Sequence, residues 1–527
     1  MSRWGWGLLI GFGVLFCLVS LPNHYNFRTY GDTAYYLQMC EFYLKGRLFY
    51  GHLTTMTPFA DKGINPPTLY VNWSVILAVP FYLLGKSWGL LIFQILCFLV
   101  GGVGIYKVVS EWLTSSQATW TLLHYFGMWG LWSAAAFEFH EVAIGVAALP
   151  WSLYFFQRGR DLLSLILWMI TVGCKEVFSI WGVFLWTGWA WLWRKVPSLR
   201  DSALKIAGIS FLYAFLLIGV ILPLAEKNFK TISRTSFYYA YLAEKHPTEA
   251  LRRQLQEGWQ GMAPPHKPRE ILLRVLQRPQ LIWSLLFESP DVTYFGVKSE
   301  LHWAVLWSGG WSFYAAPAFL WILLPIYLYK LLAANYFMWG TLHHYGLEFA
   351  LILPLSVAWV ARKSNRSRWL LPAGAILSCI MGLSLLGHRY SKWYEPERHR
   401  WYHSKHYCSE YSYARIHEGL QQIPPKASVS AVACLLTHIP MRDKLYHFPA
   451  IQDAEYLALL EGSAPCCWPM KKEAYYRFLD SLDTSKEWQK IWHRNLLRIY
   501  RRASSSGKTH SYYQGAFTST LSNTACQ

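Results

Sequence analysis

Long apolar segments separated by short polar loops make up most of the chain before about residue 388. Segments of roughly 20 apolar residues are long enough for an α-helix to cross the hydrocarbon layer of a membrane. The first segment, Trp4–Pro22, follows Arg3 and precedes no small-residue cleavage site, so we expect an uncleaved membrane helix. Further spans are predicted at 87–106, 118–137, 142–156, 161–174, 177–193, 203–223, 345–361 and 369–387.

The apolar run 303–334 is too long for one span. It contains Gly309, Gly310 and Pro317, residues that interrupt regular helices. We therefore expect two linked helices or a re-entrant pair there. The predicted fold class is an α-helical polytopic integral membrane protein with about 9–11 transmembrane helices.

The composition supports a membrane location. Hydrophobic residues make up 54% of the 527 residues and charged residues only 15%, against about 25% charged residues in soluble domains. These values exclude a disordered chain and argue against an ordinary soluble enzyme. The formal net charge of +19 would suggest nucleic acid in a soluble protein, but no basic stretch outside the apolar segments carries interleaved stacking aromatics. We therefore expect the lipid bilayer, and no nucleic acid, as the partner of these basic residues.

The distribution of lysine and arginine among the short loops predicts the orientation. Short loops rich in these residues stay in the cytoplasm. The strongest basic loops lie at 194–205 and 362–368, with a third at 158–160, and the predicted spans place all three on the side of Arg3. The chain is thus predicted to cross a membrane several times, with a cytoplasmic N-terminus.

Two long polar stretches would then be extracytoplasmic loops of a membrane domain that covers residues 1–388. They are 22–86 and 225–302, and the second contains the helix breakers Pro268 and Pro279. Long loops cross the membrane largely regardless of their charge, so their basic residues do not conflict with this orientation.

The tail is expected to form a small extracytoplasmic α/β domain over residues 389–503. The remaining residues, 504–527, are rich in serine and threonine and are predicted to be disordered. Within the domain, alternating and β-branched residues predict strands at 427–432, 444–446 and 496–500, and helical spacing covers 470–492.

Ionisable residues near apolar segments are costly and are functional candidates by default. Asp32 follows the first span and precedes a helical pattern over 33–45. Its carboxylate could act as a general base or bind a metal at the membrane surface, or it could cap the helix.

Glu138, His140 and Glu141 lie in one short break between two spans. They could bind a divalent cation or move a proton, or form a polar turn where the chain meets water.

Lys175 and Glu176 interrupt an apolar stretch. Adjacent residues point away from each other on a helix, so the two need not pair. If this point is a helix end, both side chains are interfacial. If it is buried, Lys175 needs an anionic partner, either a carboxylate such as Glu141 or a phosphate on a ligand.

His343, His344 and Tyr345 open the span at 345–361. Glu348 follows His344 by four residues and would share its helical face. Metal binding and interfacial anchoring both remain open for this group.

Common nucleotide and hydrolase motifs are absent from the sequence. There is no Walker-type phosphate loop, no dinucleotide-binding glycine motif after a strand and no GxSxG nucleophile elbow. ATP-driven chemistry and serine hydrolysis therefore have no support. No cofactor is certain, and a divalent cation is the one that the acidic residues could hold.

The combination of these groups resembles a bacterial family of polytopic membrane proteins known as a domain of unknown function. That family in turn resembles the GT-C class of glycosyltransferases. The resemblance runs from Tyr30 to about Tyr500. It is carried by Asp32 with Gln38 and Gly46, by Phe137 to His140, by Cys174-Lys175-Glu176, by His344-Tyr345, and by the tail segment 423–430 with His438, Arg442, Tyr446 and Pro449.

The resemblance implies a GT-C-like fold and transfer of a sugar from a polyprenyl-phosphate-linked donor to an extracytoplasmic acceptor of the cell envelope. Asp32 takes the place of the catalytic acidic residue in the first external loop, and Lys175 suits the donor phosphate. The chain departs from the family pattern at three places: Leu37 and Glu138 each stand where an Asp is expected, and Val71-Asn72 stands where an Asp-His pair is expected. The residues assigned to catalysis are Asp32, Glu138 and His140, and those assigned to substrate binding are Glu141, Lys175, Glu176, His343, His344 and Tyr345.

Two other functions fit a polytopic architecture. A transporter or lipid flippase would share the charges inside the membrane, but the sequence lacks the repeated halves that are common in transporters. A non-catalytic membrane scaffold of the cell envelope would agree with the departures at Leu37 and Val71-Asn72.

Overall fold

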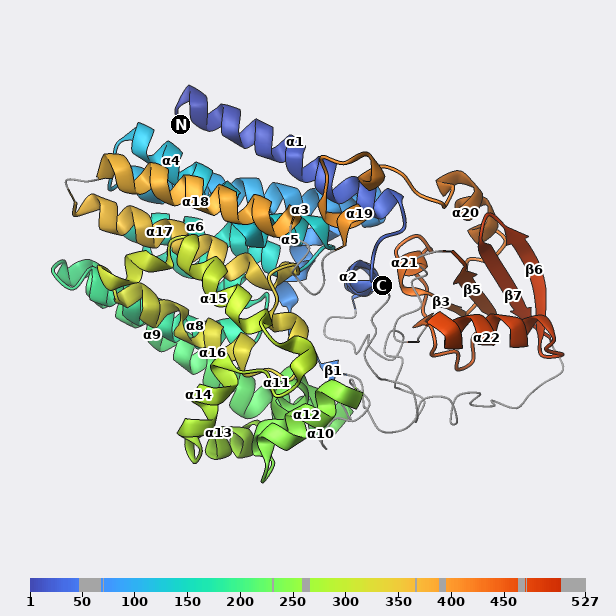
Figure 1. Ribbon diagram of the computed structural model, residues 1–527. Coiled ribbons are helices and arrows are strands. Elements are labelled where there is room, and N and C mark those ends of the chain that lie inside the picture. Colours follow the sequence, from blue (N-terminus) through green and yellow to red (C-terminus); the bar gives the residue numbers. More distant parts are fainter. Residues whose placement is uncertain are drawn as a thin grey trace.

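The computed structural model shows a bundle of long helices with a small mixed sheet at one end (Figure 1). The predicted fold class is confirmed: the chain is mainly helical, contains several strongly apolar helices and ends in a small α/β domain. The predicted disordered tail, 504–527, lies outside the residues that the structure describes. Those residues are 1–46, 68–69, 71–229, 232–257, 266–364, 367–387, 395–462, 470 and 472–503.

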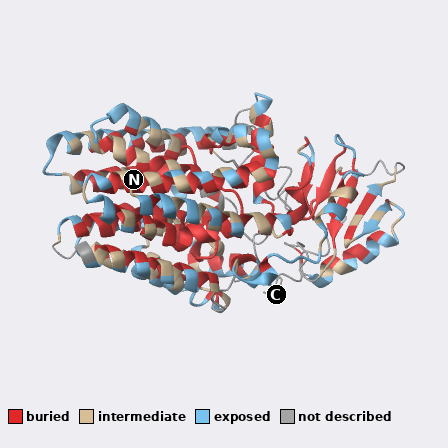
Figure 2. Cartoon of the chain, turned by 90° about the horizontal axis from the view of Figure 1, so that it is seen from above, coloured by how far each residue is buried: buried red, intermediate tan, exposed pale blue. Residues whose placement is uncertain are grey.

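The membrane domain is built from helices that run side by side (Figure 1). Five segments are long and apolar enough to cross a membrane within the described part of the chain: Arg3–Tyr25, Trp73–Ser110, Pro197–Ala225, His344–Arg362 and Trp369–Gly387. Buried residues lie on the helix faces that meet inside the bundle (Figure 2), and apolar side chains form a core there. The bundle helices are α1 (Arg3–Tyr25), α3 (Val79–Ser110), α4 (Ser115–Gly127), α5 (Trp129–Ala136), α6 (Val142–Gln157), α7 (Asp161–Val172), α8 (Val177–Leu192), α9 (Pro197–Leu216), α15 (Val297–Trp307), α16 (Ala318–Leu331), α17 (Leu347–Arg362) and α18 (Ser367–Gly387).

The segment predicted as a span at 118–137 is not one continuous helix, because the structure has two helices there, α4 and α5. Met128 between them has extended backbone, with ψ 127°. The break brings Gly130 against Gly346 so closely that a β-carbon on Gly130 would lie 2.1 Å from the Gly346 carbonyl oxygen. The mean hydropathy of a segment does not depend on the backbone conformation of one residue, so the sequence did not predict the break.

The prediction of two linked helices within 303–334 is confirmed by α15 and α16. Gly309, with φ +122°, ends the first helix region, and a short 3-10 turn at Gly310–Tyr314 leads to the second. The pair returns to the end from which it started, since the Lys298 ammonium at the start of α15 lies 4.2 Å from the ring centre of Trp339, just after α16.

The basic loops meet at the end of the bundle that lies away from the sheet (Figure 1). Arg158 forms an ion pair with Glu111 at 3.3 Å. The Arg362 guanidinium lies 5.0 Å from the ring centres of both Trp193 and Trp359. The first contact joins the loop at 158–160 to the loop between α3 and α4, and the second joins the loop at 362–368 to the end of α8. The side of the membrane on which they lie stays a prediction.

The polar insert between α9 and α15 folds into short helices. Its small core contains Tyr241, Leu251 and Trp339. Pro268 and Pro279 each begin a helix, a position where proline's missing N–H costs nothing. The elements are α10 (Leu222–Phe229), α11 (Arg234–Tyr239), α12 (Pro247–Glu257), α13 (Pro268–Leu276) and α14 (Pro279–Phe287), and β2 (Ile232–Ser233) pairs in parallel with β1 (Thr68–Leu69) of the first loop.

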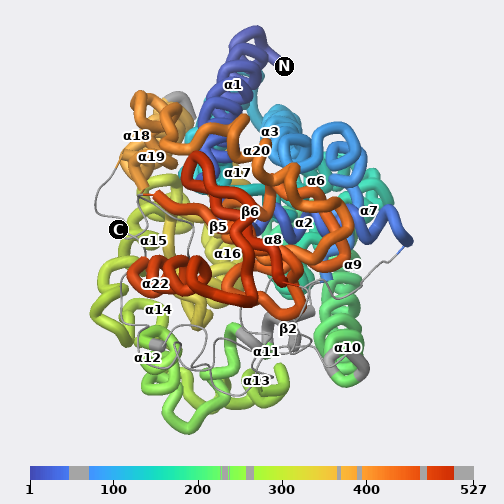
Figure 3. The backbone as a smooth tube through the Cα atoms, turned by 90° about the vertical axis from the view of Figure 1, so that its right-hand side faces the viewer, coloured from blue at the N-terminus to red at the C-terminus, as the bar shows by residue number. Residues whose placement is uncertain are grey.

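The C-terminal domain lies over the end of the bundle opposite the basic loops (Figure 3). Its sheet has the order β4-β3-β5-β7-β6, with parallel pairing among the first three strands and antiparallel pairing of the last two. The three predicted strands are confirmed as β3, β4 and β7, whereas the expected helix over 470–492 ends early and is followed by a strand. The elements are α20 (Tyr413–Leu420), β3 (Val429–Ala431), α21 (Ala433–Leu436), β4 (Leu445–His447), β5 (Tyr456–Leu460), α22 (Lys472–Asp483), β6 (Trp488–Arg494) and β7 (Leu497–Arg502).

Aromatic stacking joins the end of α1 to this domain. The imidazole of His24 stacks on that of His438 with ring centres 4.3 Å apart and planes inclined by 9°. Tyr25 stacks on Tyr413 in the same way, at 4.7 Å and 5°. The first long loop, which begins where α1 ends, is therefore held between the bundle and the domain.

Candidate active site at the sheet end of the bundle

The loop after α1 turns sharply into helix α2 (Asp32–Leu44). Gly31 precedes the helix with φ +93°, a conformation that L-residues avoid. Asp32 is therefore the first helical residue and not the helix cap that was considered as an alternative. Its side chain is about half exposed, at 51%, so the carboxylate can meet a substrate.

Glu138 caps α2 from the neighbouring turn. Its carboxylate accepts hydrogen bonds from the backbone N–H groups of Tyr30, Gly31 (3.1 Å) and Thr33 (2.8 Å). Burial and the neighbouring Asp32 carboxylate raise the pKa of Glu138 to about 6, although these N–H groups and the charge of Arg398 act in the opposite direction. Glu138 thus fixes the backbone that carries Asp32, and its two oxygens are turned toward that backbone.

His140 contacts Asp32 directly. Its Nε2 lies 3.3 Å from a carboxylate oxygen of Asp32. The backbone N–H of His140 donates to the Gln94 side chain of α3 at 2.9 Å, which fixes the turn against the bundle. The remaining ring nitrogen, Nδ1, lies 3.2 Å from the carbonyl oxygen of Glu138. The structure therefore brings the three residues assigned to catalysis into one cluster.

A turn before α17 extends this cluster. The imidazole of His344 stacks on that of His140 with ring centres 3.4 Å apart. His343 packs edge-on against Phe137, with ring centres 5.1 Å apart. Burial, with Arg398 as the next cause, lowers the pKa of His343 to about 3, so its imidazole is neutral at ordinary pH.

Tyr345, the next residue of this turn, lies between two buried lysines. The Lys175 ammonium lies 5.5 Å from the Tyr345 ring centre, and the Lys330 ammonium of α16 lies 5.6 Å from it. Lys330 also pairs with Glu348 at 3.0 Å. Glu348 therefore contacts Lys330, whereas His344 contacts His140. Their spacing of four residues had suggested that they share one helical face. The Tyr345 ring thus lies near two ammonium groups.

Glu141 and Glu176 occupy supporting positions. The Glu141 carboxylate accepts a hydrogen bond from the hydroxyl of Tyr36 on α2, which ties the turn to the first loop. Glu176 precedes α8, and its carbonyl oxygen accepts a hydrogen bond from Ser179 at 2.5 Å. Both side chains are buried. Among the described residues, no group of three or more His, Cys, Asp or Glu side chains is placed to hold a metal ion.

Two buried cations of the site were not found from the sequence. Lys330 interrupts the apolar helix α16, which was the available signal. Arg398, in α19 (Pro396–His399), lies with its guanidinium 4.1 Å from the ring centre of Tyr30. It stands among several charged residues of the tail, and nothing local distinguishes it from its neighbours.

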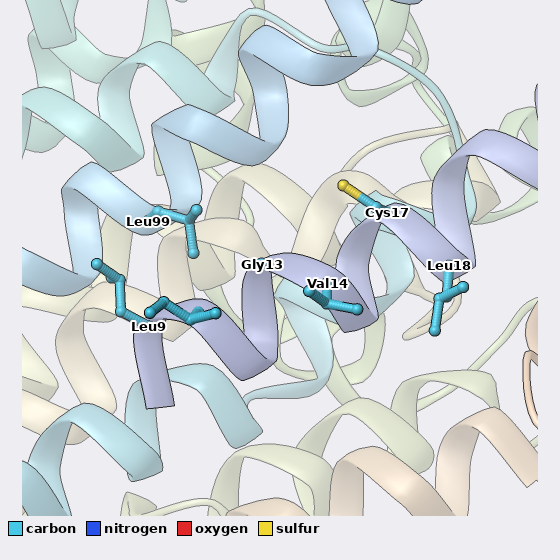
Figure 4. Close-up of a pocket in the computed structure, with 7 residues that line it drawn as sticks. Leu9, Gly13, Val14, Cys17, Leu18 and Leu99 are labelled. Carbon is cyan, nitrogen blue, oxygen red and sulfur yellow. The ribbon is translucent and has the colours of Figure 1, made fainter. Parts of the chain in front are cut away.

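An apolar pocket lies on the outer surface of α1 and α3 (Figure 4). Its lining comes from one face of α1 together with a single leucine of α3. None of the charged residues assigned above contributes to it. The lining residues are Leu9, Ile10, Gly13, Val14, Cys17, Leu18 and Leu99.

A model for a family described as predicted membrane proteins (DUF2079) matches residues 23–460. The chain belongs to this family. The match spans the first loop, the bundle helices from α3 onward and three of the five strands of the C-terminal sheet. No curated protein sequence matches this family member.

Two solved structures similar to this DUF2079 protein are membrane enzymes. ArnT from Cupriavidus metallidurans, bound to undecaprenyl phosphate, has a TM-score of 0.49 and 11% identity, over 96% of this chain and 99% of that chain. The oligosaccharyltransferase of Archaeoglobus fulgidus, in complex with zinc and sulfate, has a TM-score of 0.41 and 10% identity, over 86% of this chain and 67% of that chain. Both are GT-C glycosyltransferases, the class that the sequence resembles.

The buried Lys330–Glu348 pair gives a prediction on stability. Replacing Glu348 by Leu leaves a buried ammonium without its counter-ion, which is expected to lower the free energy of unfolding by about 3–5 kcal/mol. Replacing both residues, Lys330→Met with Glu348→Leu, is expected to restore most of this loss, because an apolar pair avoids the desolvation of two charges. Thermal unfolding of the detergent-solubilised protein measures both. A double variant as unstable as the single one would contradict this account.

Proposed function

We propose that the protein is a membrane glycosyltransferase that moves a sugar from a polyprenyl-phosphate-linked donor to an extracytoplasmic acceptor, with Asp32 as general base and Lys175 at the donor phosphate. One observation carries the proposal. An unbroken series of side-chain contacts leads from Asp32 through His140 and His344 to Tyr345 and Lys175. A half-exposed carboxylate and a buried cation thus belong to one site.

The acidic half of the site suits activation of an acceptor hydroxyl. Asp32 is exposed, while Glu138 carries the hydrogen bonds that hold the loop. His140, at 3.3 Å, can orient the Asp32 carboxylate or share its proton. The two carboxylates therefore have separate tasks: one positions the backbone and the other accepts the proton.

The cationic half suits a phosphate. Lys175 and Lys330 are 2% and 0% exposed, and Lys330 pairs with Glu348 at 3.0 Å. A buried ammonium group attracts an anion strongly, because little water screens its charge. A lipid-linked phosphate could reach Lys175 and Tyr345 from the bilayer.

In the proposed reaction, Asp32 acts on the acceptor and Lys175 acts on the donor phosphate. Asp32 takes the proton from the acceptor hydroxyl as its oxygen bonds to the anomeric carbon of the sugar. The bond between that carbon and the phosphate oxygen breaks, and the polyprenyl phosphate leaves with the electron pair. Lys175 stabilises the charge that develops on the leaving phosphate.

The location of the site agrees with transfer outside the cytoplasm. The site lies at the end of the bundle that carries the sheet, opposite the end where the basic loops meet. Because basic loops favour the cytoplasm, we propose that the site and the C-terminal domain face outward from the bacterial inner membrane.

The test is a transfer assay on the purified protein in lipid vesicles. Polyprenyl phosphates that carry different radiolabelled monosaccharides are incubated with the protein and a cell-envelope extract as the source of acceptors. We expect the label to move to an acceptor, with release of polyprenyl phosphate. If the labelled lipid crosses the vesicle membrane with its sugar intact, the protein is a flippase. If no donor is consumed and no lipid moves, the proposed transfer is wrong.

A further inference from the structure

A buried arginine from the segment before the C-terminal domain lies against the loop that carries Asp32. Arg398 belongs to the segment that leads from the bundle into the C-terminal domain, and only 2% of its side chain is exposed. Its guanidinium lies 4.1 Å from the ring centre of Tyr30 and 5.0 Å from that of Phe137. These two rings stack on each other at 5.4 Å. Tyr30 and Phe137 directly precede Gly31 and Glu138, so the guanidinium covers the point where the loop and the turn meet.

Polar contacts hold the guanidinium in this position. Its Nη2 donates a hydrogen bond to the carbonyl oxygen of Arg28 at 2.5 Å, and its Nη1 lies 3.7 Å from a Glu395 carboxylate oxygen. The Tyr30 hydroxyl donates to the same Glu395 side chain. The Arg398 carbonyl oxygen accepts a hydrogen bond from Asn23 of α1 at 3.1 Å. Arg398 is thus connected to α1 and to the loop that carries Asp32.

A second arginine fixes the segment that supplies Arg398. The Arg28 side chain donates hydrogen bonds to four carbonyl oxygens of the tail: Glu397 (2.6 Å), Lys405 (3.0 Å), His406 (2.7 Å) and Cys408 (2.5 Å). The positions of backbone carbonyl groups are fixed once the segment is folded. The tail therefore presents Arg398 to the loop as a rigid group.

Arg398 acts on the site through its charge as well as through its shape. It favours the ionised form of Glu138 and lowers the pKa of Glu138 against the opposing effect of burial. Ionised Glu138 is the acceptor for the N–H groups of Gly31 and Thr33. A neutral side chain at position 398 would leave this carboxylate without its nearby positive charge.

We infer that Arg398 is a positioning residue through which the C-terminal segment holds the Asp32 loop against Glu138. The inference rests on the proposed function, because it concerns the placement of the proposed base. Arginine suits the task since its flat guanidinium stacks on aromatic rings while its N–H groups donate in plane. Lysine keeps the charge but does not reproduce that geometry.

The test compares Arg398→Met with Arg398→Lys, and Arg415→Met, at an exposed position in α20, is the control. Arg398→Met is expected to lower kcat at least tenfold with little change in KM for the donor. The acid limb of its pH–rate profile should move to a pH about one unit higher, the size of effect that a nearby charge has on a carboxyl group. Arg398→Lys should keep the limb in place, and the control should match the wild type.

A spectroscopic readout separates this inference from the proposed function. The infrared band of the protonated Glu138 carboxyl, assigned by its loss in Glu138→Gln, is followed as a function of pH. Its midpoint should rise by about one pH unit in Arg398→Met, whether or not any donor is turned over. An unchanged midpoint, or a loss of activity that only follows the amount of folded protein, would overturn the role of Arg398. Absence of turnover in the wild type would overturn the proposed function alone.

Discussion

Replacing Asp32 by Asn is expected to abolish transfer while leaving the fold intact. Asparagine has nearly the same shape but cannot accept the proton of an acceptor hydroxyl, and loss of a general base typically lowers a rate by about 10²–10⁴-fold. The fold should survive because Glu138, and not Asp32, accepts the hydrogen bonds of the α2 N-terminus. The measurement is the rate of polyprenyl phosphate release by the variant in vesicles.

A carboxylate at the opposite end of the bundle provides the control for this variant. Asp201 is exposed at the start of α9 and pairs with Arg200, so Asp201→Asn should transfer sugar at the wild-type rate. The thermal unfolding temperatures of both variants should equal that of the wild type. If Asp32→Asn retained more than half of the activity, Asp32 would not be the base.

The second large effect is expected for Lys175→Met. The loss of a charged hydrogen-bond donor to a phosphate costs about 1.5–3 kcal/mol, so affinity for polyprenyl phosphate should fall by roughly 10–150-fold. Methionine occupies a similar volume without charge, and thermal unfolding of the variant shows whether it is folded. Titration calorimetry with polyprenyl phosphate in detergent measures the affinity directly.

Lys298 offers a matched control for this experiment. It is as buried as Lys175, with both side chains 2% exposed, and it also lies near an aromatic ring, that of Trp339. It stands beside the insert between α9 and α15 and makes none of the contacts described for the site. Lys298→Met should bind polyprenyl phosphate like the wild type. Equal losses in the two variants would show a general effect of removing a buried lysine and would argue against a phosphate at Lys175.

The hydropathy of the chain was sufficient to predict the bundle, because the bilayer requires long apolar helices whatever their neighbours are. It could not predict where a helix breaks for a packing reason. Met128 is an ordinary apolar residue, and its extended backbone is explained only by the contact of Gly130 with Gly346. The strand pattern of the tail was read correctly where residues alternate, but β5, which is buried along its whole length, was missed.

Local motifs indicated several residues of the candidate site, since charges near apolar segments stand out. The separate role of each of these residues could not be predicted from the sequence. Asp32 looked like a helix cap, yet the cap is Glu138, which is distant in the chain. Lys330 and Arg398 reach the site only through the tertiary fold. A single sequence specifies which residues are costly to bury and leaves open which of them meet.

The attachment of Arg398 to the first loop also sets an order for biogenesis. Asp32 leaves the ribosome 366 residues before Arg398, a delay of roughly 20–70 s at about 5–20 residues per second. During this time the loop lacks the group that covers Tyr30 and Phe137. A nascent chain, or one truncated before the tail, is therefore expected to insert its helices into the bilayer before the candidate site is complete.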